Sequence, residues 1–164
     1  MTEKSYGKIS APFHKNEKYV RALNLVNLIL TVAVYIAYPS LLLFVLITDR
    51  EKLLRCILVP AVMFVSVSIL RKIINRPRPY EKLGISPLIK KDKKGESMPS
   101  RHVFSVFMIA TSFLYVLPAL SVPLFIIGIL LSAVRIIGGV HYPSDILVGA
   151  AIGIISGIIG FFVI

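Results

Sequence analysis

Three polar residues in the last third of the chain have types and a spacing suited to catalysis. Arg135 carries a permanent positive charge, His141 titrates near neutral pH, and Asp145 places a carboxylate four residues after the histidine. That spacing allows the carboxylate to hold a ring nitrogen of the histidine across one helical turn. Long apolar segments lie on both sides, and polar groups are costly at membrane depth. We therefore expect all three side chains to be functional.

Two upstream segments carry groups that bind anions. The first begins with Arg71 and Lys72 and ends at Arg78, where flanking prolines interrupt the helix and keep the backbone extended. The second is Ser100-Arg101-His102, which opens the next apolar segment with Ser100 as the expected N-cap. Guanidinium groups bind phosphate oxygens through paired hydrogen bonds, and helix N-termini favour anions. The sequence therefore predicts a phosphate-binding site.

Two histidines at such a site can divide the work of phosphate transfer, because one can attack phosphorus while the other protonates the leaving oxygen. Asp145 could orient His141 and stabilise its imidazolium, whereas His102 has no carboxylate nearby in the sequence. We therefore expect His141 to be the nucleophile and His102 the general acid. A metal site is the competing interpretation, which we disfavour because the surrounding cations would repel a metal ion; no cofactor is expected.

The elements that position these residues are apolar helices. The 164 residues are 56% hydrophobic, with a mean hydropathy of +0.82, and the apolar residues form blocks of membrane-spanning length. We predict an all-α, single-domain transmembrane bundle of about five spans after a basic N-terminal tail or interfacial segment. The segment covers residues 1–22, the spans are 23–48, 53–74, 101–117, 121–137 and 144–164, and a polar loop covers 76–99. Because successive spans alternate in direction, all the polar motifs should lie on one membrane face.

The distribution of charge and glycine narrows the expected partners. The net charge is +11 and its cations concentrate between Arg71 and Arg101, which suits anionic lipid head groups better than nucleic acid. The lysine-rich stretch 90–95 should be solvated and face those head groups. Glycines recur along the last span at positions 149, 153, 157 and 160, which favours close helix packing and could also support a homo-oligomer. The single cysteine, Cys56, is expected to be buried.

The three polar segments together resemble the signature motifs of the type 2 phosphatidic acid phosphatase superfamily, which includes membrane lipid phosphatases and soluble acid phosphatases. Arg71 through Arg78-Pro79 resembles Lys-x6-Arg-Pro, Pro99 through His102 resembles Pro-Ser-Gly-His, and Arg135 through Asp145 matches Arg-x5-His-x3-Asp. Two positions depart from the family pattern. Arg71 stands for a lysine, so Lys72 could share its role, and Arg101 stands for a glycine, where it either adds a phosphate contact or constrains the entrance.

The resemblance implies a metal-independent phosphatase that acts through a phospho-histidine on His141, supported by Asp145, with His102 protonating the leaving group. The phosphate would be held by basic residues and a serine: Arg71, Arg78, Ser100 and Arg135. Expected substrates are phosphatidic acid, phosphatidylglycerol phosphate and isoprenyl phosphates or diphosphates such as undecaprenyl diphosphate. The alternative is a non-catalytic protein that binds or transports anionic lipids.

The expected location is the cell membrane. The positive-inside count places the basic loop in the cytoplasm, whereas family members in bacterial membranes generally present the site outside. We follow the family and expect an extracytoplasmic site.

Overall fold

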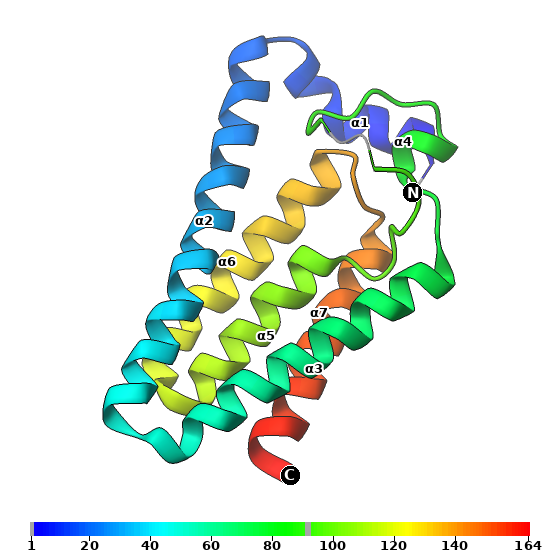
Figure 1. Ribbon diagram of the computed structural model, residues 1–164. Helices are drawn as coiled ribbons and strands as arrows, with labels where there is room; N and C mark the ends of the chain where they lie inside the picture. Colours follow the sequence, from blue (N-terminus) through cyan, green and yellow to red (C-terminus); the bar gives the residue numbers. More distant parts are fainter. Residues whose placement is uncertain (1, 91–92) are drawn as a thin grey trace.

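The computed structural model describes residues 2–90 and 93–164, so Lys91 and Asp92 of the lysine-rich stretch lie outside the described residues. The described chain is helical and contains no strand, which confirms the predicted fold class. In order, the elements are α1 (Glu3–His14), α2 (Glu17–Thr48), α3 (Arg50–Ile74), α4 (Pro79–Lys82), α5 (Arg101–Val116), α6 (Pro118–Ile137), α7 (Pro143–Ile158) and a π-helical segment, η1 (Ile159–Val163) (Figure 1).

The five predicted spans each correspond to a helix. Four helical stretches in the described ranges are long and apolar enough to cross a membrane: Glu17–Thr48, Arg50–Lys82, Pro118–Ile137 and Pro143–Val163. The remaining helix, α5, has only 16 residues. It is the central helix of the bundle, packed between α6 and α7, and every residue from Val103 to Phe113 except Ser105 is buried. The first motif-bearing helix after the polar loop is therefore surrounded by protein.

Helix starts differ from the predicted boundaries where a cap was overlooked. Two helices begin within the segment predicted as a tail or interfacial segment, because Thr2 accepts a hydrogen bond from Ser5 N–H and starts α1, while Asn16 accepts one from Lys18 N–H and starts α2, six residues before the predicted span. Helix α6 begins at Pro118, three residues before the predicted start. Proline is favoured in the first helical turn, where its missing N–H costs no hydrogen bond.

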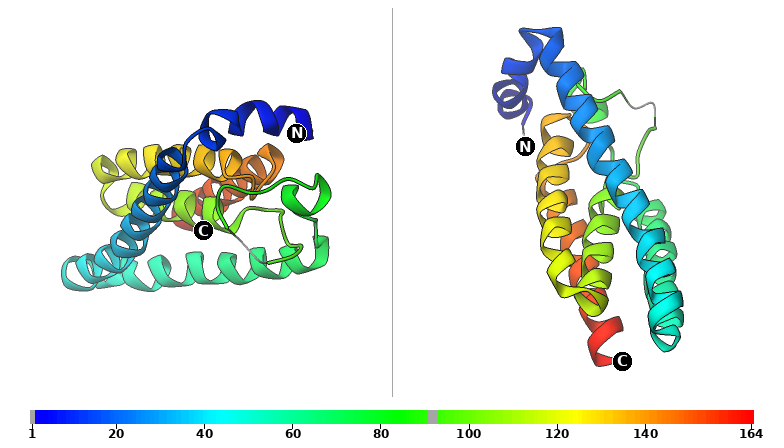
Figure 2. Two further views of the ribbon diagram at one scale, coloured as in Figure 1. Left: turned by 90° about the horizontal axis from the view of Figure 1, so that it is seen from above. Right: turned by 90° about the vertical axis from the view of Figure 1, so that its left-hand side faces the viewer.

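The arrangement of the helices places the polar motifs together. Helices α2 and α3 cover one side of the group formed by α5, α6 and α7 (Figure 2), and both expose large apolar side chains along their lengths. Such an apolar exterior suits contact with lipid chains. The end of α3, the start of α5, the end of α6 and the start of α7 all lie at the end of the bundle near α1 and α4 (Figure 1). The chain therefore brings its three polar segments to one end.

The glycines of the last span serve packing within the chain. A Cβ atom at Gly149 would lie 2.7 Å from the backbone oxygen of Ser100, and one at Gly153 would lie 2.7 Å from that of Phe104. Gly157 faces Thr111 of α5, and Gly160 faces Val59 of α3. The helices approach closely because these positions have no side chain. Self-association through this helix stays a prediction.

Replacing Gly149 with alanine is expected to lower the free energy of unfolding by about 1–3 kcal/mol, the usual cost of overpacking a tight contact. The added methyl group would push against backbone that cannot swing aside, and it would displace Ser100 at the start of α5. Thermal unfolding in detergent measures the change. Gly7→Ala is the matched control, since a Cβ atom there meets nothing within 4 Å. Equal unfolding temperatures for Gly149→Ala and the wild type would contradict the packing role.

Candidate active site

Seven polar side chains are buried together where the three motifs meet, and none is more than 4% exposed. We call this set the buried polar cluster: Arg71, Arg78, Ser97, Ser100, Arg135, His141 and Asp145. Burying three arginines and one carboxylate is costly, because charged groups lose their hydration. Such a costly arrangement is typical of a functional site. The cluster is therefore the candidate active site.

Two of the buried arginines fix the backbone around the cluster. Arg71, in the last turn of α3, donates to the carbonyl oxygens of Pro99 and Glu96. Arg78 donates to the carbonyl of Gly95 over 3.1 Å and to that of Val140, next to His141, also over 3.1 Å. Neither guanidinium has a carboxylate side-chain partner among the described residues. Their positive charge therefore remains available to an anion.

The loop before α5 is held by one acidic side chain. Glu81, in α4, accepts hydrogen bonds from the N–H groups of Arg78, over 2.6 Å, and Gly95, over 3.0 Å. A further bond joins Ser97 N–H to the carbonyl of Arg76 over 2.9 Å. These hydrogen bonds hold the two ends of the loop against each other, and this places Ser97 inside the cluster.

Asp145 is a fully buried carboxylate, and each of its oxygens is bonded. Oδ1 lies 2.7 Å from Nη1 of Arg76, and Oδ2 accepts hydrogen bonds from Ser97 Oγ over 2.5 Å and Tyr142 N–H over 2.9 Å. The guanidinium of Arg76 also lies 4.4 Å from the centre of the Tyr142 ring. Charge pairing and three donors favour the ionised carboxylate and fix its orientation.

Ser97 links that carboxylate to His141. The distance from His141 Nδ1 to Asp145 Oδ2 is 3.6 Å, too long for a direct hydrogen bond, whereas Ser97 Oγ lies 3.4 Å from Nδ1. Because an ionised carboxylate only accepts, the Ser97 hydroxyl must donate to Asp145 and accept from the Nδ1–H of His141. This assignment leaves the Nε2 lone pair of His141 free. Sequence spacing indicated a direct contact; the structure inserts a serine.

Ser97→Ala is expected to lower kcat about 10- to 100-fold with little change in KM. A hydrogen bond to a charged group contributes about 1.5–3 kcal/mol, and here it orients the histidine rather than the substrate. Steady-state kinetics measure the split, and Ser97→Thr should restore part of the rate because it keeps the hydroxyl. Ser86→Ala, at an exposed position of the same loop, is the control. A loss confined to KM would contradict a positioning role.

Burial lowers the pKa of His141 to about 4 from its ordinary value of 6.5, and the charges of Arg78 and Arg71 act in the same direction. The negative charge of Asp145 opposes this shift and offsets it only in part. The imidazole is therefore neutral at pH 7, as a nucleophile must be.

A histidine NMR titration should therefore find the His141 resonance titrating near pH 4, with His141→Gln identifying the signal. Since the unfolded chain binds this proton near pH 6.5, the contribution of His141 to stability is complete above that pH. It is lost as the pH falls towards 4. A resonance titrating at 6.5 would show that the ring is solvated.

Two polar atoms of the cluster have no protein partner. The hydroxyl oxygen of Ser100 and Nε of Arg135 are buried without a hydrogen bond. Ser100 is the N-cap residue of α5 as predicted, but its side chain makes no capping bond. Instead its N–H donates to the carbonyl of Asp145 over 2.9 Å, which joins the starts of α5 and α7. Unpaired buried donors in a cluster with three arginines suit an oxygen-rich anion.

The structure separates the remaining predicted residues from this set. Lys72 is exposed, while its neighbour Arg71 turns inward, so of the two only Arg71 belongs to the cluster. Arg101 and His102 are half-buried and line a pocket of about 220 Å³ between α2, α3, α5 and α6. The predicted role of His102 as general acid stays a prediction.

Two residues of the site were missed from the sequence. They are Arg76 and Ser97. Their partner Asp145 lies 69 and 48 residues away, respectively. The only local signal in the sequence was that Ser97 is polar and lies just before the second motif.

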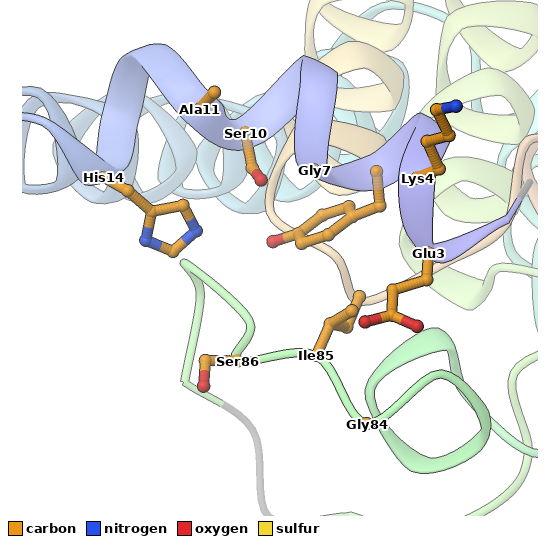
Figure 3. Close-up of a pocket in the computed structure, with 10 residues that line it drawn as sticks. Glu3, Lys4, Gly7, Ser10, Ala11, His14, Gly84, Ile85 and Ser86 are labelled. Carbon is orange, nitrogen blue, oxygen red and sulfur yellow. The ribbon is translucent and has the colours of Figure 1, made fainter.

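A larger pocket lies elsewhere, between α1 and residues 84–86 (Figure 3). It measures about 680 Å³ and is lined by side chains such as Glu3, Lys4 and His14. None of its lining residues belongs to the buried polar cluster. Its size alone therefore does not make it the active site.

Comparison with known proteins supports the motif assignment. No match to the chain is found among curated proteins. Among solved structures, Aquifex aeolicus LpxE is similar, with 32% identity and a TM-score of 0.67 over 88% of this chain and 93% of that one. A transmembrane PAP2-type phosphatidylglycerolphosphate phosphatase from Bacillus subtilis has 21% identity and a TM-score of 0.52 over 94% and 90%, respectively, and shares the fold.

The family model of the PAP2 superfamily matches residues 41–163, which include all three motifs. Four apolar helices and the similarity to membrane proteins of this family identify a membrane protein. With its three polar motifs gathered at one end of a helical bundle, this chain belongs to the PAP2 superfamily of phosphatases.

Proposed function

We propose that the protein hydrolyses a phosphate monoester or diphosphate carried by a membrane lipid, through a phospho-histidine on His141. The observation that carries this proposal is the burial of three arginines around a neutral histidine without carboxylate side-chain partners. A binding protein would need the arginines but not a histidine oriented through Ser97 and Asp145.

The proposed reaction has two steps. Nε2 of His141 attacks phosphorus, the bond to the leaving oxygen breaks, and His102 gives a proton to that oxygen. Water, losing a proton to His102, then attacks the phospho-histidine, which releases phosphate and restores the neutral imidazole. Charge on the transferred group is balanced by Arg71, Arg78 and Arg135, with Ser100 Oγ as a further donor. Asp145 and Ser97 keep the attacking ring in position.

No metal ion takes part in these steps, so activity is expected to survive EDTA. The test is phosphate release by purified protein in detergent from phosphatidic acid, phosphatidylglycerol phosphate, isoprenyl phosphate and isoprenyl diphosphate. At least one substrate should be hydrolysed with and without EDTA. No release from any of them would refute the phosphatase, and release only after a metal is added would refute the mechanism.

The lipid substrate follows from the position of the site. An apolar groove of about 590 Å³ lies between α2, α3 and α5 and shares four lining residues with the pocket that holds His102. A lipid could keep its chain in the groove while its head group reaches the cluster. This arrangement favours a lipid phosphate over a small soluble ester.

We place the site on the extracytoplasmic face of the cell membrane. For the test, the buried natural cysteine, Cys56, is replaced by serine, and a single new cysteine is introduced in place of the exposed Lys94. A membrane-impermeant maleimide should label that cysteine in intact cells. Labelling only after the membrane is opened would place the site inside.

A further inference from the structure

Arg101 occupies an unusual position beside the candidate active site. It follows Ser100 of the buried polar cluster, is half-buried, and places its guanidinium 5.3 Å from the centre of the Phe64 ring of α3. The side chain makes no ion pair with a carboxylate in the described ranges, 2–90 and 93–164. An aromatic face supports a cation but does not cancel its charge. Arg101 is therefore a half-buried positive charge that no carboxylate of the described residues neutralises, so it is available to bind an anion.

The surroundings of Arg101 connect it to the apolar groove. Arg101 and His102 line the pocket of about 220 Å³, and that pocket shares Val34, Tyr35, Phe64 and Ser105 with the groove between α2, α3 and α5. The groove continues from these shared residues along apolar side chains such as Leu42, Pro60 and Met108. Arg101 thus lines a pocket that adjoins the groove, and it is the next residue in the chain after Ser100 of the cluster.

The groove, the pocket with Arg101 and the cluster can be matched to the successive groups of a lipid substrate. A chain in the groove and a scissile phosphate at His141 would place the intervening part of the head group against Arg101. The cluster already provides three arginines for the scissile phosphate. An additional cation on the lipid side matches an additional anion on the lipid side.

We propose that Arg101 binds a second phosphate of the substrate, the one that remains with the lipid after hydrolysis. The inference rests on the proposed function and narrows its substrate class to lipids with two phosphates in one head group. Two chemistries supply this group: a diphosphate, and a phosphomonoester joined to the lipid through a phosphodiester. A lipid with a single phosphate offers Arg101 nothing to bind.

The experiment compares matched substrate pairs. Farnesyl phosphate is paired with farnesyl diphosphate, and phosphatidic acid with phosphatidylglycerol phosphate, with initial rates measured for the wild type, Arg101→Gln and Arg101→Lys. In at least one pair the wild type should prefer the two-phosphate member. Arg101→Gln should reduce that ratio of kcat/KM values about tenfold, mainly through KM, and Arg101→Lys should retain part of it. The pair that responds identifies the source of the second phosphate.

Lys94→Gln is the charge-matched control, because Lys94 is exposed on the loop that precedes the motif. It should leave both ratios unchanged. Equal losses on both members of each pair in Arg101→Gln would assign the residue to the scissile phosphate instead. Unchanged ratios in Arg101→Gln would also overturn the proposal.

A binding measurement separates this proposal from the proposed function. In a His141→Ala background, farnesyl diphosphate should raise the unfolding temperature more than farnesyl phosphate does. Arg101→Gln should remove that difference. If the wild type released no phosphate, the phosphatase function would fail, and this comparison would still decide whether Arg101 binds the second phosphate. An undiminished difference in Arg101→Gln would refute it.

Discussion

Replacing His141 with alanine is expected to reduce kcat by about 10⁴-fold or more, the scale on which loss of a nucleophile acts. His141 carries the only imidazole of the cluster, and the one carboxylate there, Asp145, has both oxygens engaged in hydrogen bonds. The protein should still fold, because the neutral ring of His141 forms no ion pair that the change would break. Phosphate release measures the loss, and thermal unfolding in detergent checks the fold.

The same residue should carry the covalent label. Wild-type protein mixed with a ³²P-labelled lipid substrate and quenched in alkaline detergent should retain label, because the P–N bond of phospho-histidine is stable in base. His141→Ala should retain none. Label on His102 would reverse the assigned roles, and rapid turnover without any trapped label at the earliest time would favour direct attack by water.

Asp145→Asn is expected to lower kcat about 10²- to 10⁴-fold, the range seen when an orienting carboxylate becomes neutral without changing shape. In the wild-type protein, Oδ2 of Asp145 accepts hydrogen bonds from Ser97 Oγ and Tyr142 N–H, and Oδ1 pairs with Arg76. In an amide one of the two accepting oxygens is replaced by an NH2 group, which would face a donor instead of accepting from it, and Arg76 would lose its counter-charge. Both His141 orientation and local stability should suffer.

Glu96→Gln is the matched control for this charge loss, because the Glu96 carboxylate lies outside the cluster and pairs over 2.8 Å with Lys93, whose side chain is 51% exposed. That change should leave kcat close to the wild type. Arg76→Gln removes the partner while keeping the carboxylate and should have a smaller effect on kcat than Asp145→Asn. If Asp145→Asn turned over at the wild-type rate while folded, the orienting role of the carboxylate would be wrong.

The helical bundle and the identity of the motifs could be read from the sequence because both are local or compositional. Apolar blocks of spanning length predict helices, and the alternation of spans places every other turn on the same face. Each of the three motifs lies within one short segment, from Arg71 to Pro79, from Pro99 to His102 and from Arg135 to Asp145. The starts of α2 at Glu17 and of α6 at Pro118 precede the predicted ones because they depend on single residues, the N-cap Asn16 and the first-turn proline.

The geometry of the site required contacts between distant parts of the chain. Whether Arg71 or Lys72 turns inward depends on how α3 packs, and the partners of Ser97 and Arg76 are set by the fold of the loop around Glu81. Each sequence segment is polar enough to allow several arrangements. The loop that Glu81 holds together selects one of these arrangements.

Composition and motif spacing by themselves determined that the chain is a helical membrane protein with arginines, two histidines and an aspartate gathered on one face. The tertiary structure decided that Ser97 stands between His141 and Asp145, that Arg76 neutralises the carboxylate, and that Arg101 lines a pocket adjoining the groove. The physical reason is that hydropathy acts along one helix, whereas hydrogen bonds and ion pairs of a buried site form only after helices far apart in sequence have packed.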